Sequence, residues 1–241
     1  MEMFTTSLDW GSELVTSLIW IAKAWAMAAF GTLVVLFLLG RFTTWGRQFW
    51  RITGAYFTGR ESVKVWAWLG AILLSVISGV RLDVLFSFQG NDMMTGAQVA
   101  VQGLSGGDEA VRQSGVDGFW AALWMFALLA TIHVARVMLD LYMMQRFMLA
   151  WRTWLTARLT SDWLDGKAYY RSRFIDDTID NPDQRIQSDI DIFTAGVGPL
   201  PNTPNNMTTS TLLFGAINAI ASMLSFTAIL WHLSGTLTIA V

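Results

Sequence analysis

Cysteine is absent from this chain of 241 residues, lysine occurs three times and histidine twice. The lack of cysteine excludes disulfides, thiol chemistry and zinc–thiolate sites. The few lysines exclude the nucleotide-binding loop G-x-x-x-x-G-K-[ST], because only Lys167 follows a glycine and Ala168 comes next. This chain alone cannot bind ATP by that route, and no ATPase activity is expected from it.

Charge is also scarce, since 14% of the residues are charged against about 25% in soluble domains. The deficit is concentrated in four apolar runs, at residues 24–39, 65–80, 119–135 and 212–241. Basic residues at the ends of the shorter runs can reach the interface with their side chains. We therefore predict an all-α integral membrane protein with four spans, at about 20–40, 63–88, 117–136 and 210–233. A large soluble helical protein is the weaker alternative.

The basic residues predict the orientation of these spans. Thirteen of the sixteen Lys/Arg lie in residues 40–64 and 136–195, whereas the 81–118 loop has two of them and five acidic residues. By the positive-inside rule the two basic stretches are cytosolic, which places the amino terminus outside. The chain is therefore predicted to cross its membrane several times.

The cytosolic stretches retain a helical apolar period. Aromatic and aliphatic residues recur every three or four positions over 42–57, which predicts a helix that lies flat in the interface as an elbow. No Gly or Pro interrupts residues 119–164, so one long helix is expected to extend from the membrane into the cytosol. Its expected apolar stripe comprises Val137, Leu141, Met144, Met148, Trp151, Leu155 and Leu159. Pro182 suits the first position of a returning helix, so residues 137–195 form two cytosolic helices joined by a charged bend.

Two further segments interrupt this pattern. The loop 88–118 contains seven glycines and is expected to form short helices and turns on the outer face. Residues 196–211 hold three of the four prolines, which predicts an irregular segment. That segment could line an aqueous cavity or form a plain surface loop.

Few groups are placed to carry chemistry. The Asp-rich stretch 176–191 fails as an EF-hand loop, because Asn181 stands where that loop requires glycine. Arg136 and Asp140 are expected to pair at i,i+4, which would explain both charges. His133 and His232 lie near span ends, where a hydrogen-bonded interior role is favoured over proton transfer. No metal site is expected.

Several blocks of residues resemble a known family. They are W-R-T-W-L-T at 151–156, D-W-L-D-G-K-A-Y-Y-R at 162–171 and I-D-N-P-D-Q-R-I-Q-S-D at 179–189. They resemble the ABC transporter permeases of the peroxisomal D-subfamily and the bacterial SbmA/BacA-like importers, which share the type 2 ABC transmembrane region. W-G-R-Q-F-W-R at 45–51, R-L-D-V-L-F-S-F-Q-G-N-D-M at 81–93 and S-F-T-A-I-L-W-H-L-S-G-T-L at 225–237 resemble mycobacterial fused permease–ATPases.

The resemblance implies an ABC-exporter-like transmembrane domain that works as a homodimer in the lipid of a bacterial inner membrane. It also implies that this domain imports hydrophilic solutes such as cobalamin or peptides by alternating access. It implies a coupling loop that touches an ATPase domain, fused downstream or supplied in trans. The coupling residues it implies are Tyr169, Tyr170, Asn181, Pro182, Asp183, Gln184 and Arg185. ATP and Mg²⁺ would bind to that ATPase domain, which is absent here, so we expect the chain to be the amino-terminal half of the permease. No cofactor on this chain and no nucleic-acid partner are expected.

Two other functions remain open. A BacA-like peptide permease without an ATPase domain would use the proton gradient, and a downstream ATP-binding motif would distinguish it from an ABC importer. A non-transporting membrane scaffold or sensor, whose cytosolic helices bind a partner, would require the chain to be complete at Val241. A membrane enzyme is the least favoured class.

Overall fold

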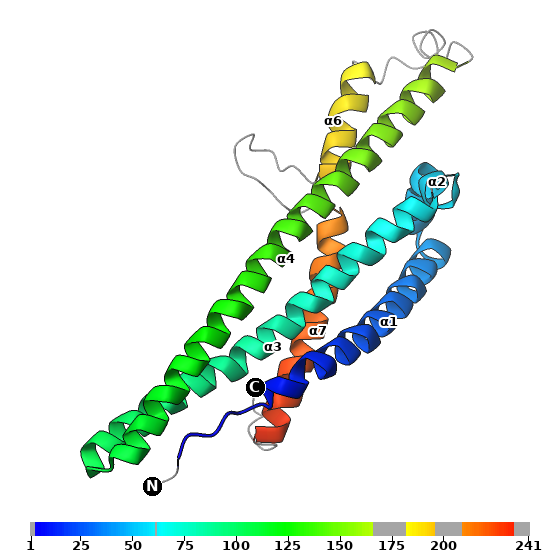
Figure 1. Ribbon diagram of the computed structural model, residues 1–241. Coiled ribbons are helices and arrows are strands. Elements are labelled where there is room, and N and C mark those ends of the chain that lie inside the picture. The colour runs from blue at the N-terminus through cyan, green and yellow to red at the C-terminus, as the bar shows by residue number, and fades with distance from the viewer. Residues whose placement is uncertain (1–2, 61, 166–181, 196–208, 234–241) are drawn as a thin grey trace. The chain divides into compact units, whose positions relative to one another are not determined.

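The computed structural model describes residues 3–60, 62–165, 182–195 and 209–233, and every regular element in these ranges is a helix. The elements are α1 (Trp10–Phe42), α2 (Thr44–Thr58), α3 (Ser62–Gly106), α4 (Glu109–Leu164), α6 (Pro182–Ala195) and α7 (Thr209–Leu233) (Figure 1). The predicted all-α membrane fold is confirmed, since α1, α3 and α4 are each long and apolar enough to cross a bilayer. Within α7 a shorter apolar stretch covers Ile217–Ile229.

The long continuous helix expected at 119–164 is confirmed, and it begins ten residues earlier than expected. α4 has 56 residues, which at 1.5 Å each gives a length of about 84 Å. A bilayer core is only about 30 Å thick. More than half of α4 therefore extends beyond any membrane that it crosses.

The expectation of short helices and turns over 88–118 is wrong. α3 continues to Gly106, and only Gly107 and Asp108 separate it from α4. Gly107 adopts a left-handed conformation with a φ of 68°, and the Asp108 carboxylate caps α4 by accepting hydrogen bonds from the amides of Ala110 and Val111. Gly96, Gly103 and Gly115 lie inside the helices and let the two backbones approach closely instead of breaking them. A Cβ added at Gly115 would lie 2.2 Å from the Ala100 amide nitrogen on the neighbouring helix.

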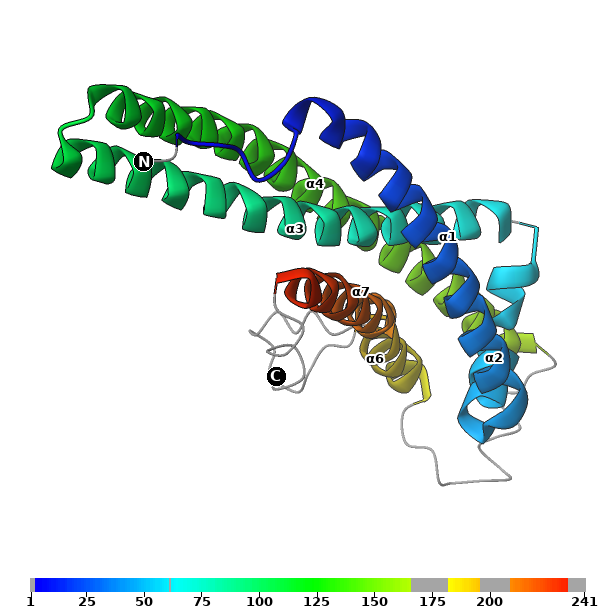
Figure 2. The same ribbon diagram turned by 90° about the horizontal axis from the view of Figure 1, so that it is seen from below.

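Figure 2 shows the result, a tight antiparallel hairpin of α3 and α4. Asp108 and Glu109 lie at its tip. Arg112 donates a hydrogen bond to Glu109 at 2.9 Å. Hydrogen bonding to this guanidinium lowers the pKa of the exposed Glu109 carboxyl below its ordinary value. Both members of this ion pair therefore remain charged at neutral pH.

The elbow helix expected at 42–57 is present as α2, one residue away from α1. Its N-cap is Thr43, whose hydroxyl accepts a hydrogen bond from the Gly46 amide at 2.9 Å. The returning helix starts at Pro182, as the sequence predicts. Whether α2 lies in a membrane interface stays a prediction.

The chain divides into two compact units, which are described separately here. The first unit comprises residues 1–28, 73–140 and 218–241, and the second comprises 29–72 and 141–217. In the first unit, Leu82, Leu85 and Leu129 form a buried cluster between α3 and α4. In the second unit, the buried positions of α4 follow four-residue steps, and they are Met143, Phe147, Trp151 and Leu155.

This buried ridge corrects the stripe predicted for α4. Trp151 and Leu155 are buried as expected, but Leu141 is exposed and Phe147 takes the place expected for Met148. The sequence period mixes three- and four-residue steps, whereas the helix buries the single row formed by four-residue steps. Met144, Met148 and Leu159, beside this row, are only partly buried.

Candidate functional site

The seven residues predicted to couple to an ATPase fall at the boundary of the described chain. Tyr169, Tyr170 and Asn181 lie outside the described residues. Pro182, Asp183, Gln184 and Arg185 occupy the first turn of α6, where Gln184 is exposed and the other three side chains lie outside the description. What the structure does show is how the two helices on either side of this loop, α4 and α6, are held.

An aromatic junction holds α2, α4 and α6 together in the second unit, and we define it by Phe49, Phe57, Phe147, Trp151 and Phe193. Trp151 of α4 is its centre. Its ring lies 5.4 Å from that of Phe193 on α6, measured between centroids. The rings of Phe49 and Phe57 on α2 are each 6.3 Å from it, and that of Phe147 is 6.1 Å away. These separations are typical of favourable aromatic pairs.

The centre of the junction is buried, while Phe49, Phe57 and Phe193 around it are half-buried. Trp151 is 1% exposed, and the neighbouring Leu155 and Ile190 are also buried. Phe49 contacts Phe193 directly at 5.8 Å, so α2 and α6 touch as well as each touching α4. Figure 1 shows α6 (yellow) beside the end of α4 (light green). Three helices therefore meet in one packed cluster.

A second set of contacts secures α2 at its far end. Tyr56 lies 5.1 Å from Trp154 of α4, centroid to centroid. Trp154 also supports the Arg158 guanidinium, 5.3 Å above its ring, in a cation–π contact. The indole nitrogen of Trp66 donates a hydrogen bond of 3.0 Å to the Phe57 carbonyl. Displacement of α4 or α6 must therefore be transmitted to α2, because packed side chains shift together rather than deform independently.

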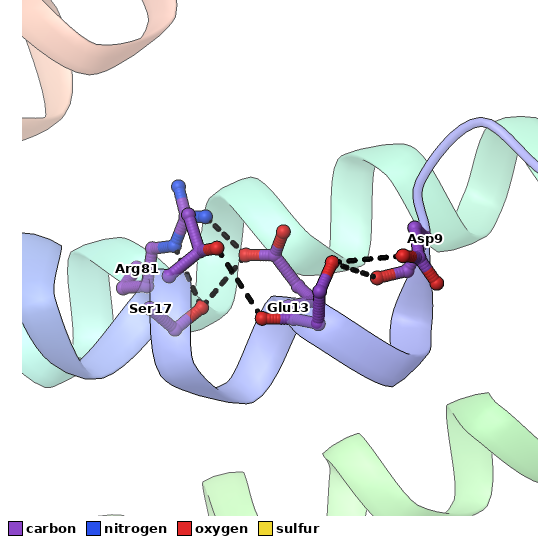
Figure 3. Close-up of polar contacts among 6 residues, drawn as sticks. Asp9, Glu13, Ser17 and Arg81 are labelled. Carbon is purple, nitrogen blue, oxygen red and sulfur yellow. Dashed lines mark hydrogen bonds and ion pairs between the residues drawn. The ribbon is translucent and has the colours of Figure 1, made fainter.

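A buried ion pair connects α1 to α3 in the first unit (Figure 3). Arg81 of α3 pairs with Glu13 of α1, and its Nε donates a hydrogen bond of 3.0 Å to the Ser17 hydroxyl. Its guanidinium also lies 5.6 Å from the centre of the Trp20 ring. Ser17 in turn donates to the Glu13 carboxylate at 2.8 Å. Every charge here has a partner, so the cluster fixes α1 against α3.

The residues before α1 lie against the α3–α4 hairpin. The Asp92 carboxylate, which is almost fully buried, accepts hydrogen bonds from the Ser7 amide at 2.7 Å and from the Trp10 indole at 3.3 Å. The Phe4 amide donates to the Ser114 hydroxyl at 3.0 Å. A cavity of about 100 Å³ lies beneath this segment, lined by residues that include Gln89 and Asp92. Its size suits a few water molecules.

Arg136 of α4 makes a polar contact with α3 in the first unit. Arg136 donates a hydrogen bond to the Ser75 carbonyl at 2.9 Å. The expected Arg136–Asp140 pair is not formed. Both residues are described, no ion pair joins them, and the Asp140 Oδ1 atom is buried without a hydrogen-bond partner. The guanidinium is drawn across to α3 because Gly79 leaves room for it. A Cβ at that position would lie 2.7 Å from Arg136 Nη1.

In the described ranges, no group of three or more His, Cys, Asp or Glu side chains could hold a metal ion.

Sequence reasoning identified Trp151 only as one position of an apolar stripe. It did not identify the junction, because the partners of Trp151 come from α2 and α6, more than forty residues away on one side and the other.

Comparison with known proteins adds a family. The family model for the ABC transporter transmembrane region 2 matches residues 52–241. An uncharacterized ABC transporter ATP-binding protein of Haemophilus influenzae is 31% identical over 232 residues, which are 96% of this chain and 35% of that protein. The inner membrane ABC transporter ATP-binding protein of Escherichia coli is 28% identical over 185 residues, 76% of this chain and 28% of that one.

A human relative is similar over a shorter stretch. The human lysosomal cobalamin transporter is 31% identical over 78 residues, which are 32% of this chain and 13% of that protein. The chain spans about a third or less of the length of each of these relatives.

Proposed function

The chain belongs to the ABC transporter transmembrane region 2 family, and from that premise we propose that it forms the membrane-spanning part of an ATP-driven importer of hydrophilic solutes. It acts as a homodimer in a bacterial inner membrane, with its amino terminus outside and α2 at the cytosolic interface. An ATPase domain, fused downstream or bound in trans, supplies the energy by binding ATP and Mg²⁺. Relatives described as ATP-binding proteins support this partner.

The observation that carries the proposal is the aromatic junction. An ATPase can drive transport only if its movement reaches the membrane helices through a stiff connection. α4 ends at Leu164 and α6 begins at Pro182, so the residues between them are joined at both ends to helices that meet at Trp151. A push on these residues is thereby passed to α4, which contains the apolar run 119–135.

The proposed contact with the ATPase is the loop and the first turn of α6. We assign coupling to Tyr169, Tyr170, Asn181, Pro182, Asp183, Gln184 and Arg185. Gln184 is exposed, as a docking residue must be. The solute class rests on the human relative described as a cobalamin transporter and on the resemblance to importers of hydrophilic compounds.

The test is a coupling variant in the full-length transporter. Asn181→Ala with Pro182→Ala removes the expected cap of α6, and uptake of cobalamin or of a hydrophilic test peptide should fall while membrane insertion persists. Gln187→Ala with Ser188→Ala, two exposed positions of the same helix, is the matched control and should retain uptake. Equal uptake by both variants would refute the coupling role.

The same assay tests the energy source. Uptake should require ATP hydrolysis and should stop when vanadate traps the ATPase. Uptake that is unaffected by vanadate but abolished by a protonophore would contradict the ABC importer and favour the proton-driven permease. If neither cobalamin nor the peptide enters, the proposed solute class is wrong.

A further inference from the structure

The contact between α3 and α4 in the first unit contains an unusual group of polar atoms. In the part of the chain that the structure describes, five buried side-chain nitrogen or oxygen atoms have no hydrogen-bond partner. Four of them lie on these two helices within this unit, and they are Ser75 Oγ, His133 Nδ1, Arg136 Nε and Asp140 Oδ1. We call these four residues the α3–α4 polar seam.

The seam is contiguous along the helices. His133, Arg136 and Asp140 are spaced by three and four residues, so they share one face of α4. Arg136 reaches Ser75 of α3 by its hydrogen bond to the Ser75 carbonyl. The His133 ring meets Phe86, further along α3, at 5.8 Å between centroids. The face of α4 that carries these side chains is therefore the face turned toward α3.

Packing alone does not account for these atoms. A buried polar group without a partner costs about 1–3 kcal/mol, and lipid offers no hydrogen bonds to compensate for it. The simplest structural solution, an ion pair between Arg136 and Asp140, is not formed. Ser75 lies in the middle of the apolar run 65–80 and is only 7% exposed. Ionisable side chains in such helices are kept where they serve a hydrophilic path.

We propose that the α3–α4 polar seam lines the hydrophilic path through the membrane and there contacts the transported solute. In this conformation α3 and α4 are in contact and the four atoms are buried. When the two helices separate, water or polar groups of the solute become hydrogen-bond partners of these atoms. Arg136 supplies a positive charge and a free N–H donor, so the seam takes a solute with oxygen acceptors such as carboxylate, phosphate or amide groups. This inference rests on the proposed transport function and names the residues that the solute meets.

The absence of cysteine makes a direct test possible, because a single introduced cysteine is the only thiol on this chain. Ser75→Cys places it in the seam with little change in volume. Leu74→Cys is the exposed control, at 45% exposure, and Ile77→Cys is the buried apolar control, at 1%. The three variants are made in the full-length transporter, with any cysteine outside these 241 residues replaced. They are treated in membrane vesicles with a charged methanethiosulfonate reagent, with and without ATP and vanadate.

Only the thiolate reacts, and it forms readily where water reaches the sulfur. We expect Ser75→Cys to react at least about tenfold faster than both controls in one of the two nucleotide states. If Ser75→Cys is labelled no faster than the controls in either nucleotide state, the seam does not line the hydrophilic path. If that result is found while ATP-dependent uptake is intact, it contradicts the role of the seam and leaves the proposed transport function standing. Fast labelling that never changes with nucleotide supports a hydrated seam and counts against ATP-driven alternation.

Contact with the solute is tested by protection. A saturating concentration of whichever probe the uptake assay identifies, cobalamin or the test peptide, should slow labelling of Ser75→Cys. The residual labelling of Leu74→Cys should not change. Labelling of Ser75→Cys at the same rate with and without the transported probe would overturn the solute contact.

Discussion

Replacing Trp151 with alanine is expected to open the aromatic junction. Removal of a fully buried Trp side chain costs about 3–5 kcal/mol. The four ring contacts of Trp151, at about 0.5–1.5 kcal/mol each, give a similar sum. Because every 1.4 kcal/mol is a factor of ten, the equilibrium constant for the closed junction should fall by roughly 140- to 4,000-fold. α6 would then no longer follow α4.

The measurement is thermal unfolding of the full-length transporter in detergent, together with its uptake. Trp151→Ala should lower the unfolding temperature and abolish uptake while membrane insertion persists. Trp124→Ala on the same helix is the matched control, because Trp124 is 75% exposed and should tolerate truncation. Equal stability and uptake of the two variants would refute the idea that the junction holds and couples these helices.

Trp151→Phe tests whether Trp151 acts through the packing of its ring or through its indole N–H. The Trp151 indole N–H is buried without a hydrogen-bond partner, which costs about 1–3 kcal/mol. Phenylalanine removes this donor but keeps a ring in the cluster, so the two effects offset each other. We expect Trp151→Phe to stay within about 1 kcal/mol of the natural protein. A loss as large as that of Trp151→Ala would mean that the indole nitrogen is bonded and not merely packed.

The remaining predictions concern packing between other helices. Arg81→Met leaves the buried Glu13 charge unpaired and should cost about 3–5 kcal/mol, which thermal unfolding would detect. Adding Glu13→Gln should recover part of that loss, and strictly additive losses would contradict a direct pair. Gly115→Ala should force α3 and α4 apart, because its Cβ would meet backbone at 2.2 Å. Gly90→Ala has open space around it and should stabilise α3 by about 0.5–1 kcal/mol. A lower unfolding temperature for Gly90→Ala than for Gly115→Ala would overturn this reading of the hairpin. Thr43→Ala removes the N-cap of α2 and should cost about 0.5–2 kcal/mol, with faster amide exchange in its first turn as the readout.

Helix type and extent were largely predictable, because they depend on local signals. The uninterrupted run to Leu164 predicted the end of α4, and Pro182 predicted the start of α6. The elbow helix α2 was predicted from the apolar residues that recur every three or four positions over 42–57. The hairpin at 88–118 was missed because glycine has two roles, as a breaker and as a contact that lets helices approach. Only the position of the partner helix decides between them, as Gly115 against Ala100 shows.

The candidate site was less predictable, because it depends on contacts between distant residues. Arg136 and Asp140 have the spacing of a helical ion pair, and local reasoning therefore paired them. The structure turns Arg136 to Ser75, some sixty residues away, through a gap left by Gly79. Trp151 likewise shows its role only beside Phe49 and Phe193. A sequence period indicates which face is buried but not which element covers it.

Crosslinking from the proposed coupling turn tests the central claim most directly. Gln184→Cys is introduced into the full-length transporter, with any cysteine outside these 241 cysteine-free residues replaced. The protein is labelled with a benzophenone maleimide and irradiated, and the crosslinked peptides are identified by mass spectrometry. Ser105→Cys, also at an exposed position, near the end of α3, is the control. We predict crosslinks from position 184, and none from position 105, to a domain that carries G-x-x-x-x-G-K-[ST]. Crosslinks to that domain from position 105 alone, or from neither position, would contradict the coupling of this chain to an ATPase through α6.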